Sequence, residues 1–246
     1  MVENIYTESI RSASMLRLGF ERIGIEVTDE MIGKLIAYRD EILEYNKSIN
    51  LTAIRDPKSF LAVHYLDSAE AVTLKEFKEA ETIIDVGTGG GFPGVPLAVL
   101  APDKKFVLMD SLGKRIKVIS GIAEKLGISN IEFVHSRAED LGRDKKHREK
   151  YDMAVSRAVA SLPVLAEYCL PFVRIGGAFI AYKSVDAEQE ADEARTAIHL
   201  LGGKKDRIED VAEAGPVDHR LVVIKKVSGT PSKYPRRAGM PSKAPL

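Results

Sequence analysis

The feature that most constrains the fold is an alternation between short β-rich runs and helical stretches, which fills the chain from Thr82 to Lys226. Such alternation predicts a mostly parallel sheet with helices on both faces, a doubly wound α/β fold. The expected strands are Thr82–Val86, Phe106–Asp110, Ile131–His135, Tyr151–Ser156, Gly177–Tyr182, Leu221–Lys226 and, more weakly, Asp206–Val211.

Two segments lie outside this alternation. Residues 1–78 carry apolar side chains at helical spacing, and one helix begins after an N-cap at Thr28 or Asp29. Its apolar face consists of Met31, Leu35, Tyr38, Ile42 and Tyr45. We therefore divide the chain into a helical N-terminal subdomain (1–78), an α/β domain (79–227) and a tail (228–246).

The tail combines basic charge with residues that stop regular structure. From Val227 onward it holds four prolines and two glycines, and no acidic residue follows Lys225. We expect this tail to be extended, or to be ordered only by a partner.

A glycine-rich turn follows the first expected strand. Its glycines are Gly87, Gly89, Gly90, Gly91 and Gly94. A turn of this kind, at the start of a helix, brings the backbone of a doubly wound sheet close to a nucleotide ligand. Gly89, Gly91 and Gly94 also match the weak dinucleotide pattern GxGxxG, but prolines at 93 and 96 remove N–H donors that a phosphate needs. S-adenosylmethionine, which has no phosphate, fits the turn better.

Acidic residues follow the next two strands at the same edge of the sheet. Asp110 can accept both ribose hydroxyls of a nucleoside, although it can also cap the helix expected from Leu112 to Leu126. After the third strand, the Ala138 N–H and the Glu139 carboxylate can read an adenine edge. The alternative for Glu139 is an ordinary first-turn acid that interacts with a helix dipole.

Composition removes several other classes of protein. The single cysteine, Cys169, excludes an internal disulfide and a thiolate-rich metal site. Lys plus Arg and Asp plus Glu both number 36, so the net charge indicates neither a nucleic acid nor a membrane. No apolar stretch reaches the roughly 18 residues that cross a bilayer, and the five histidines lack paired ligand spacing. We expect a cytoplasmic protein with no membrane partner and no metal.

Short motifs spread over most of the chain. They are Tyr45-Asn46, Asn50 to Pro57, His64 to Ser68, Gly91 to Gly94, Asp110-Ser111, Lys114-Arg115, Arg137 to Glu139, Ser156 to Val159, Tyr234 to Arg237 and Gly239 to Pro241. In this combination the chain resembles the bacterial 16S ribosomal RNA guanine-N7 methyltransferases of the glucose-inhibited division B type. One departure is Tyr45, which stands where that family usually has tryptophan.

The resemblance implies a class I S-adenosylmethionine-dependent methyltransferase. Its sheet is Rossmann-like and mostly parallel with an antiparallel last strand, behind a helical N-terminal extension. It implies that the chain transfers a methyl group from S-adenosylmethionine to N7 of a guanine in 16S ribosomal RNA, as free RNA or in the small ribosomal subunit. No protein partner is inferred.

The residues implied for this activity fall into three groups. Cofactor contacts are expected at Gly87, Phe92, Asp110, Ser111, Leu112, Ala138, Glu139 and Arg157, to which the glycine-rich turn adds Gly89 and Gly91. Arg157 and His64 are the expected catalytic residues. RNA contacts are expected at Lys183, Lys233, Arg236 and Arg237. A chain that ends at Ser228 is therefore expected to bind RNA more weakly while its cofactor affinity barely changes.

What the chain lacks narrows the chemistry. The fourth strand ends in Ser156 to Val159 rather than in the Asn or Asp, Pro, Pro and aromatic pattern of exocyclic-amine methyltransferases. Methylation of a base carbon needs a thiolate, and Cys169 lies in an apolar stretch. A ring nitrogen such as guanine N7 needs no deprotonation, so we expect in-line transfer without a general base.

Two other functions use the same observations. A nicotinamide-dependent dehydrogenase would share the sheet and the GxGxxG pattern, but the sequence contains no Tyr-x-x-x-Lys pair. An RNA-binding module could keep a cofactor pocket for stability alone. Methyl transfer to ribosomal RNA separates this module from an enzyme.

Overall fold

The computed structural model describes residues 2–210 and 219–246. Its centre is a seven-stranded sheet in the order β3-β2-β1-β4-β5-β7-β6. Only β7 runs against its neighbours, which confirms the predicted mostly parallel sheet with an antiparallel last strand. The strands are β1 (Thr82–Val86), β2 (Lys105–Asp110), β3 (Ile131–His135), β4 (Tyr151–Arg157), β5 (Val173–Lys183), β6 (Gly203–Asp210) and β7 (Arg220–Lys226). Val211, the expected end of the weaker strand, lies outside the described residues.

Successive residues of the central strands face opposite sides of the sheet, as strand geometry requires. Ile83 packs with the N-terminal helices, whereas Ile84 packs with the helices that follow β4. The first face carries α6 (Gly94–Leu100) and α7 (Gly113–Lys125). The other face carries α8 (Ala138–Leu141), α9 (Leu162–Cys169), a 3-10 turn at Leu170–Phe172, α10 (Ala187–Glu193) and α11 (Arg195–Leu200).

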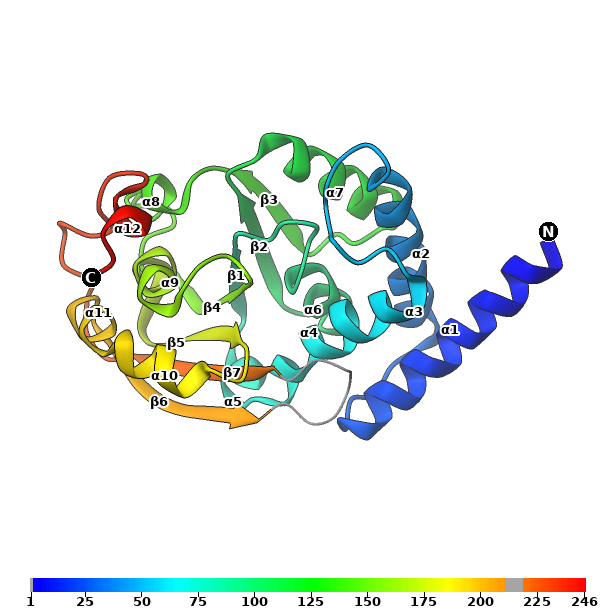
Figure 1. Cartoon of the computed structure of the whole chain (residues 1–246), viewed down its shortest axis with the longest axis horizontal. Helices are drawn as coiled ribbons and strands as arrows, with labels where there is room; N and C mark the ends of the chain where they lie inside the picture. The colour runs from blue at the N-terminus through cyan, green and yellow to red at the C-terminus, as the bar shows by residue number, and fades with distance from the viewer. Residues whose placement is uncertain (1, 211–218) are drawn as a thin grey trace.

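The N-terminal region is helical, and it shares one hydrophobic core with the sheet. Its long helices are α1 (Val2–Arg22) and α2 (Asp29–Tyr45), and α1 extends beyond the body of the molecule (Figure 1). Thr28 caps α2 by accepting a hydrogen bond from the Met31 N–H at 3.2 Å. The shorter elements are α3 (Pro57–Phe60), a π-helix (Leu61–Leu66), α4 (Asp67–Ala69), a 3-10 helix (Glu70–Thr73) and α5 (Lys75–Glu79).

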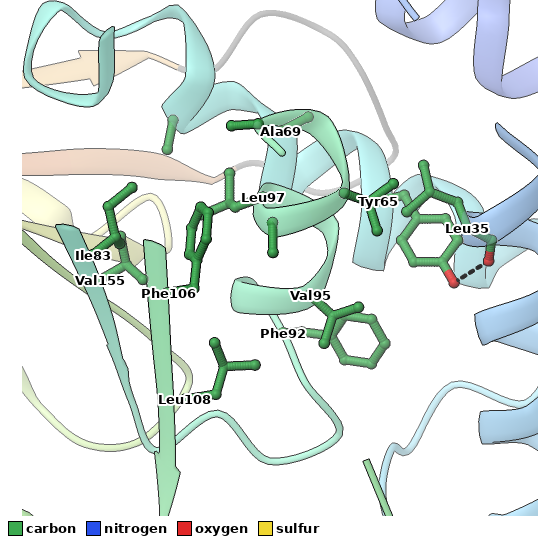
Figure 2. Close-up of a cluster of buried hydrophobic side chains, with 14 of the residues drawn as sticks. Leu35, Tyr65, Ala69, Ile83, Phe92, Val95, Leu97, Phe106, Leu108 and Val155 are labelled. Carbon is green, nitrogen blue, oxygen red and sulfur yellow. Dashed lines mark hydrogen bonds between the residues drawn. The ribbon is translucent and has the colours of Figure 1, made fainter. Parts of the chain in front are cut away.

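Packing of α2 follows its predicted apolar face with one exception. Leu35, Tyr38 and Ile42 are fully buried, but Tyr45 is 42% exposed because α2 ends there and leaves the core. Figure 2 shows Leu35 beside Tyr65, whose hydroxyl donates to the Leu35 carbonyl at 2.5 Å. Burial of these aromatic side chains fixes the N-terminal helices against α6.

The tail differs from its expected extended state, because the body of the protein itself orders it. The Arg148 guanidinium donates to four carbonyl oxygens, those of Gly142, Thr230, Pro231 and Tyr234. Beyond these contacts the chain forms α12 (Met240–Lys243), which lies beside α9. Sequence reading missed this arrangement because the partners of Arg148 are backbone oxygens, which no side-chain pattern records.

Candidate active site

A cavity of about 550 Å³ lies at the carboxyl ends of the parallel strands β1 to β4. This is the crevice where doubly wound sheets bind their ligands. Most of the predicted cofactor residues line it, namely Gly87, Gly89, Phe92, Asp110, Ser111, Ala138, Glu139 and Arg157, and so does His64. Residues 51–53 of the N-terminal region form one further wall of the cavity. Another wall is formed by Tyr168 of α9 together with Gly239 and Ser242 of the tail.

Two predicted cofactor residues do not line the cavity. Gly91 turns toward Tyr38, whose hydroxyl would collide with any Cβ at that position. Leu112 is half exposed and serves as the N-cap residue of α7. Both follow the ligand-facing residues by one position, and sequence position alone could not decide which way each would point.

The glycine-rich turn has no cradle for a phosphate. The N–H groups of Gly89, Gly91, Phe92, Gly94 and Val95 all donate to protein acceptors. Gly94, the first residue of α6, donates to Asp85 Oδ2 at 2.9 Å, and Thr88 Oγ1 donates to the same oxygen at 2.7 Å. The backbone N–H groups at the start of α6 already have protein acceptors, and Pro93 and Pro96 supply no N–H. The turn therefore suits a ligand without phosphate.

Asp85 lies buried beneath this turn and acts as its internal anchor. Burial raises the pKa of Asp85 to about 7, and the hydrogen bonds from Thr88 and Gly94 oppose that rise. Among the described residues nothing donates to its second oxygen, Oδ1. Asp85 therefore stiffens the turn from below rather than facing the cavity.

Asp110 caps α7, as the sequence suggests, and also lines the cavity. Its Oδ1 accepts from the Leu112 N–H at 2.8 Å, which caps α7, and its Oδ2 accepts from the Gly89 N–H at 3.0 Å. Each carboxylate oxygen can accept a further hydrogen bond. Asp110 thus ties the glycine-rich turn to β2 and keeps acceptor capacity at the cavity.

At the far end of the cavity the buried Glu139 contacts the tail. Its Oε1 accepts from the Gly239 N–H at 2.7 Å. The Tyr168 hydroxyl and Ser242 Oγ lie 2.7 Å apart beside it. No sequence pattern predicted that the tail reaches this site.

His64 lies in a network that fixes its protonation and its tautomer. The Arg157 guanidinium donates to His64 Nδ1 at 2.9 Å, so Nδ1 is an acceptor and the proton lies on Nε2. Nε2 then donates to Thr52 Oγ1 at 2.6 Å. Burial, and secondarily the charge of Arg157, lowers the pKa of His64 to about 3, against an opposing contribution from Asp67. His64 is therefore neutral at physiological pH.

Arg157 is held as firmly as the histidine that it contacts. Its guanidinium donates to the Val63 carbonyl at 2.7 Å and to Asp67 Oδ2 at 2.6 Å. Asp67 also contacts His219 Nδ1 at 2.5 Å. His219, which sequence reading did not select, precedes the antiparallel β7 and so reaches the same edge of the sheet.

Phe92 completes the wall beside His64. The two rings stack with centroids 4.1 Å apart and an interplanar angle of 6°, and the Arg157 guanidinium lies 5.7 Å from the Phe92 ring centre. Figure 2 places Phe92 beside Val95 at the start of α6. This end of the cavity therefore combines a flat apolar surface with one fixed cation.

The segment after β4 forms the rim above the glycine-rich turn. Ala158 has a positive φ of 56°, a strained conformation for a residue with a side chain. Val159, which is 40% exposed, packs so closely on Gly87 that a Cβ there would lie 2.6 Å from its Cγ2. This turn thus places an apolar side chain at the mouth of the cavity.

Two of the four predicted RNA contacts lie in internal ion pairs instead of facing solvent. Lys183 donates to the Ala160 carbonyl and pairs with Glu190 at 2.7 Å, so it secures the rim. Arg236 pairs with the buried Glu167 at 2.6 Å. By contrast, the Arg237 side chain is exposed and has no partner among the described residues, and the Lys233 ammonium lies over the ring of Tyr234.

Three further observations concern metal ligands, the cysteine and membrane spans in the described part of the chain. Residues 2–210 and 219–246 contain no group of three or more His, Cys, Asp or Glu side chains that could hold a metal ion. Cys169 is buried, and burial raises the pKa of its thiol. No helix within the described residues is both long and apolar enough to cross a membrane.

The fold is that of the class I methyltransferases. An O-methyltransferase from Streptomyces achromogenes, TomG, solved with S-adenosylmethionine, shares this fold with a TM-score of 0.54 and 16% identity over 90% of this chain and 99% of that one. An O-methyltransferase from Bacillus cereus shares it with a TM-score of 0.54 and 17% identity, covering 77% and 91%. At these identities the likeness concerns the fold.

Sequence relatives identify the family within this class. The sequence model of rRNA small subunit methyltransferase G, GidB, matches residues 31–221. A protein named ribosomal RNA small subunit methyltransferase G from Alkaliphilus oremlandii is 47% identical, covering 94% of this chain and 98% of the relative. The protein of that name from Acetivibrio thermocellus is 44% identical, covering 97% and 98%. The chain belongs to the rRNA small subunit methyltransferase G family, as the motifs predicted.

Proposed function

We propose that this protein transfers the methyl group of S-adenosylmethionine to N7 of a guanine in the 16S RNA of the small ribosomal subunit, in the cytoplasm. The observation that carries the proposal is the cavity itself, whose strand-end residues suit a nucleoside without phosphate in a chain of this family. The cofactor supplies an electrophilic methyl group on a sulfonium. The protein supplies position and electrostatics.

The hydrogen-bonding groups that line the cavity match particular parts of the cofactor. Asp110 offers acceptors for ribose hydroxyls, and Glu139 with the Ala138 N–H offers an acceptor and a donor for adenine. Gly87 and Gly89 allow close approach of the backbone to the ligand, and Phe92 bounds the site toward His64.

The protonation state of His64 favours guanine N7 as the target. His64 is neutral and already donates its proton to Thr52, while Nδ1 accepts from Arg157. The N7 lone pair lies in the ring plane and is unprotonated at neutral pH, so its attack requires orientation only. In this proposal Arg157 and His64 orient the target base, and Val159 bounds it from the rim.

Labelled S-adenosylmethionine and small subunits isolated without this modification test the proposal. We expect one guanine to gain label at N7, at a rate that Asp110→Asn lowers through weaker cofactor binding. Asp140→Asn, at an exposed acid on α8, is the matched control and keeps the parental rate. Label at an exocyclic amine or at a carbon, or no transfer to any RNA, would refute it.

A further inference from the structure

The end of the tail lines the same cavity as the predicted cofactor residues. Gly239 and Ser242 line the same space as Asp110 and Glu139. They belong to a segment that the sequence assigned to RNA, and neither carries a charge. Their position therefore calls for a role other than contact with phosphate.

Contact with Glu139 gives this segment a specific chemical connection to the site. Glu139 is buried, and the Gly239 N–H occupies its Oε1. Its other oxygen, Oε2, has no hydrogen-bond partner in the described residues, although Glu139 lines the cavity. The tail thus fixes the carboxylate while one acceptor stays open for a ligand donor such as an amine.

Fastening of the tail elsewhere makes this wall rigid before any ligand binds. Arg236 lies three residues before Gly239, and both its backbone N–H and its guanidinium donate to the buried Glu167. On the other side, Tyr168 holds Ser242 through their hydroxyls at 2.7 Å. Gly239 has a φ of +80°, so its left-handed turn aims the N–H at Glu139.

We propose that residues 239–242 are part of the cofactor site and form the wall at its adenine end, where they position Glu139 to accept from the adenine amine. This inference rests on the proposed function, because it takes the ligand of the cavity to be S-adenosylmethionine. It also reverses the expectation that loss of the tail leaves cofactor affinity unchanged. Because the tail and the ligand contact one carboxylate, each stabilises the bound position of the other.

A truncation after Ala238 isolates this wall, since it keeps Arg236 and its ion pair with Glu167 as well as Lys233 and Arg237. The probe is S-adenosylhomocysteine, measured by calorimetric titration. We expect the truncated chain to bind at least about tenfold more weakly, the loss of one well-placed hydrogen bond to a charged acceptor. Lys243→Ala in the full chain controls for the lost charge and keeps the parental affinity.

Hydrogen exchange on the full-length chain gives a second measurement that needs no variant. S-adenosylhomocysteine should slow exchange of the Gly239 amide at least about tenfold, because that amide donates to Glu139. The edge strand β6, which does not line the cavity, serves as the internal reference and should change little.

The outcomes separate this inference from the proposed function. If the full chain binds S-adenosylhomocysteine and the truncated chain binds it equally well, the wall assignment is wrong and the proposed function stands. If the full chain binds none, the cofactor assignment fails first. If the truncated chain does not fold, as judged by circular dichroism, an unchanged exchange rate at Gly239 alone overturns the inference.

Discussion

The two regions that flank the sheet each supply one wall of the cavity, by different physical means. The N-terminal region packs aromatic and aliphatic side chains into a continuous core and presents a neutral His64. The tail has few apolar anchors and is held by ionised side chains, above all Arg148 and the Arg236–Glu167 pair. One wall is thus fixed by burial of apolar surface, and the other by charge-assisted hydrogen bonds.

This difference teaches that two walls can be held equally firmly by interactions of which only one kind is predictable from sequence. Buried apolar side chains recur with the period of a helix or strand, whereas no sequence pattern indicates that a guanidinium will bind carbonyl oxygens. It also predicts that the two walls respond to different perturbations, which the following experiments examine.

The largest effect is expected from a cavity in the N-terminal core. Phe20 on α1 is fully buried, so Phe20→Ala should lower the free energy of unfolding by about 3 to 5 kcal/mol. Leu18→Ala on the same helix, at a side chain that is 57% exposed, should change it by less than about 0.5 kcal/mol. Urea denaturation measures both. Equal effects would show that α1 does not contribute to the wall through burial.

The tail should respond almost as strongly to the loss of one charge. Arg236→Ala leaves the carboxylate of Glu167, which is 1% exposed, buried without its cationic partner and with only the backbone N–H of residue 236, and should cost about 3 kcal/mol. The neighbouring Arg237→Ala, at an exposed side chain without a partner, is the matched control and should cost nothing measurable. Thermal unfolding of the two variants decides the matter, and identical melting temperatures would contradict a charge-fastened tail.

The same pair of variants sharpens the assignment of RNA contacts. If Arg237 contacts a phosphate, the plot of log affinity against log salt should become shallower in Arg237→Ala, its negative slope losing about 0.7 to 0.9 in magnitude. Arg236→Ala, measured well below its melting temperature, should keep the parental slope, because its guanidinium is already paired within the protein. Filter binding to a 16S RNA fragment over a salt series provides the measurement. A reversed pattern would exchange the two roles.

A smaller effect is expected from the protonation of His64. Its pKa of about 3 in the folded state lies below the ordinary 6.5, so between these values the unfolded chain binds more protons than the folded one. The stability of the parent relative to His64→Gln should therefore rise with pH, by up to about 1.4 kcal/mol per unit, until about pH 6.5. Above that pH the difference should stay constant. Urea denaturation at pH 5.5, 6.5 and 7.5 tests this sign.

The smallest expected effect is on the pH dependence of catalysis. With His64 neutral throughout, the single-turnover rate at saturating cofactor and RNA should be nearly flat between about pH 6.5 and 8.5. The cofactor must be saturating because Asp85, with a pKa of about 7, anchors the glycine-rich turn and titrates in this window. Saturation prevents a change in cofactor affinity with pH from altering the measured rate. A rising limb of slope one that disappears in His64→Gln would make His64 a general base.

The sequence predicted the sheet and most of the strand-end residues because both follow from periodic patterns. Asp110 and Glu139 could be located, since each ends or follows a β-rich run on the same edge. The position of His219 could not, because no sequence pattern pairs it with Asp67, which lies 152 residues away. The contacts of Arg148 were equally hidden, since a basic loop gives no sign of which carbonyl oxygens it will meet.

The contacts that shape the cavity join distant parts of the chain, and this has a consequence for the order of folding. His219 contacts Asp67 across 152 residues, and Gly239 contacts Glu139 across 100. Because the entropic cost of closing a loop grows with its length, we expect these contacts to form after the local helices and neighbouring strands. The cavity should therefore be absent from the folding transition state. Cofactor binding then prolongs the lifetime of the native state by slowing unfolding, without speeding its formation.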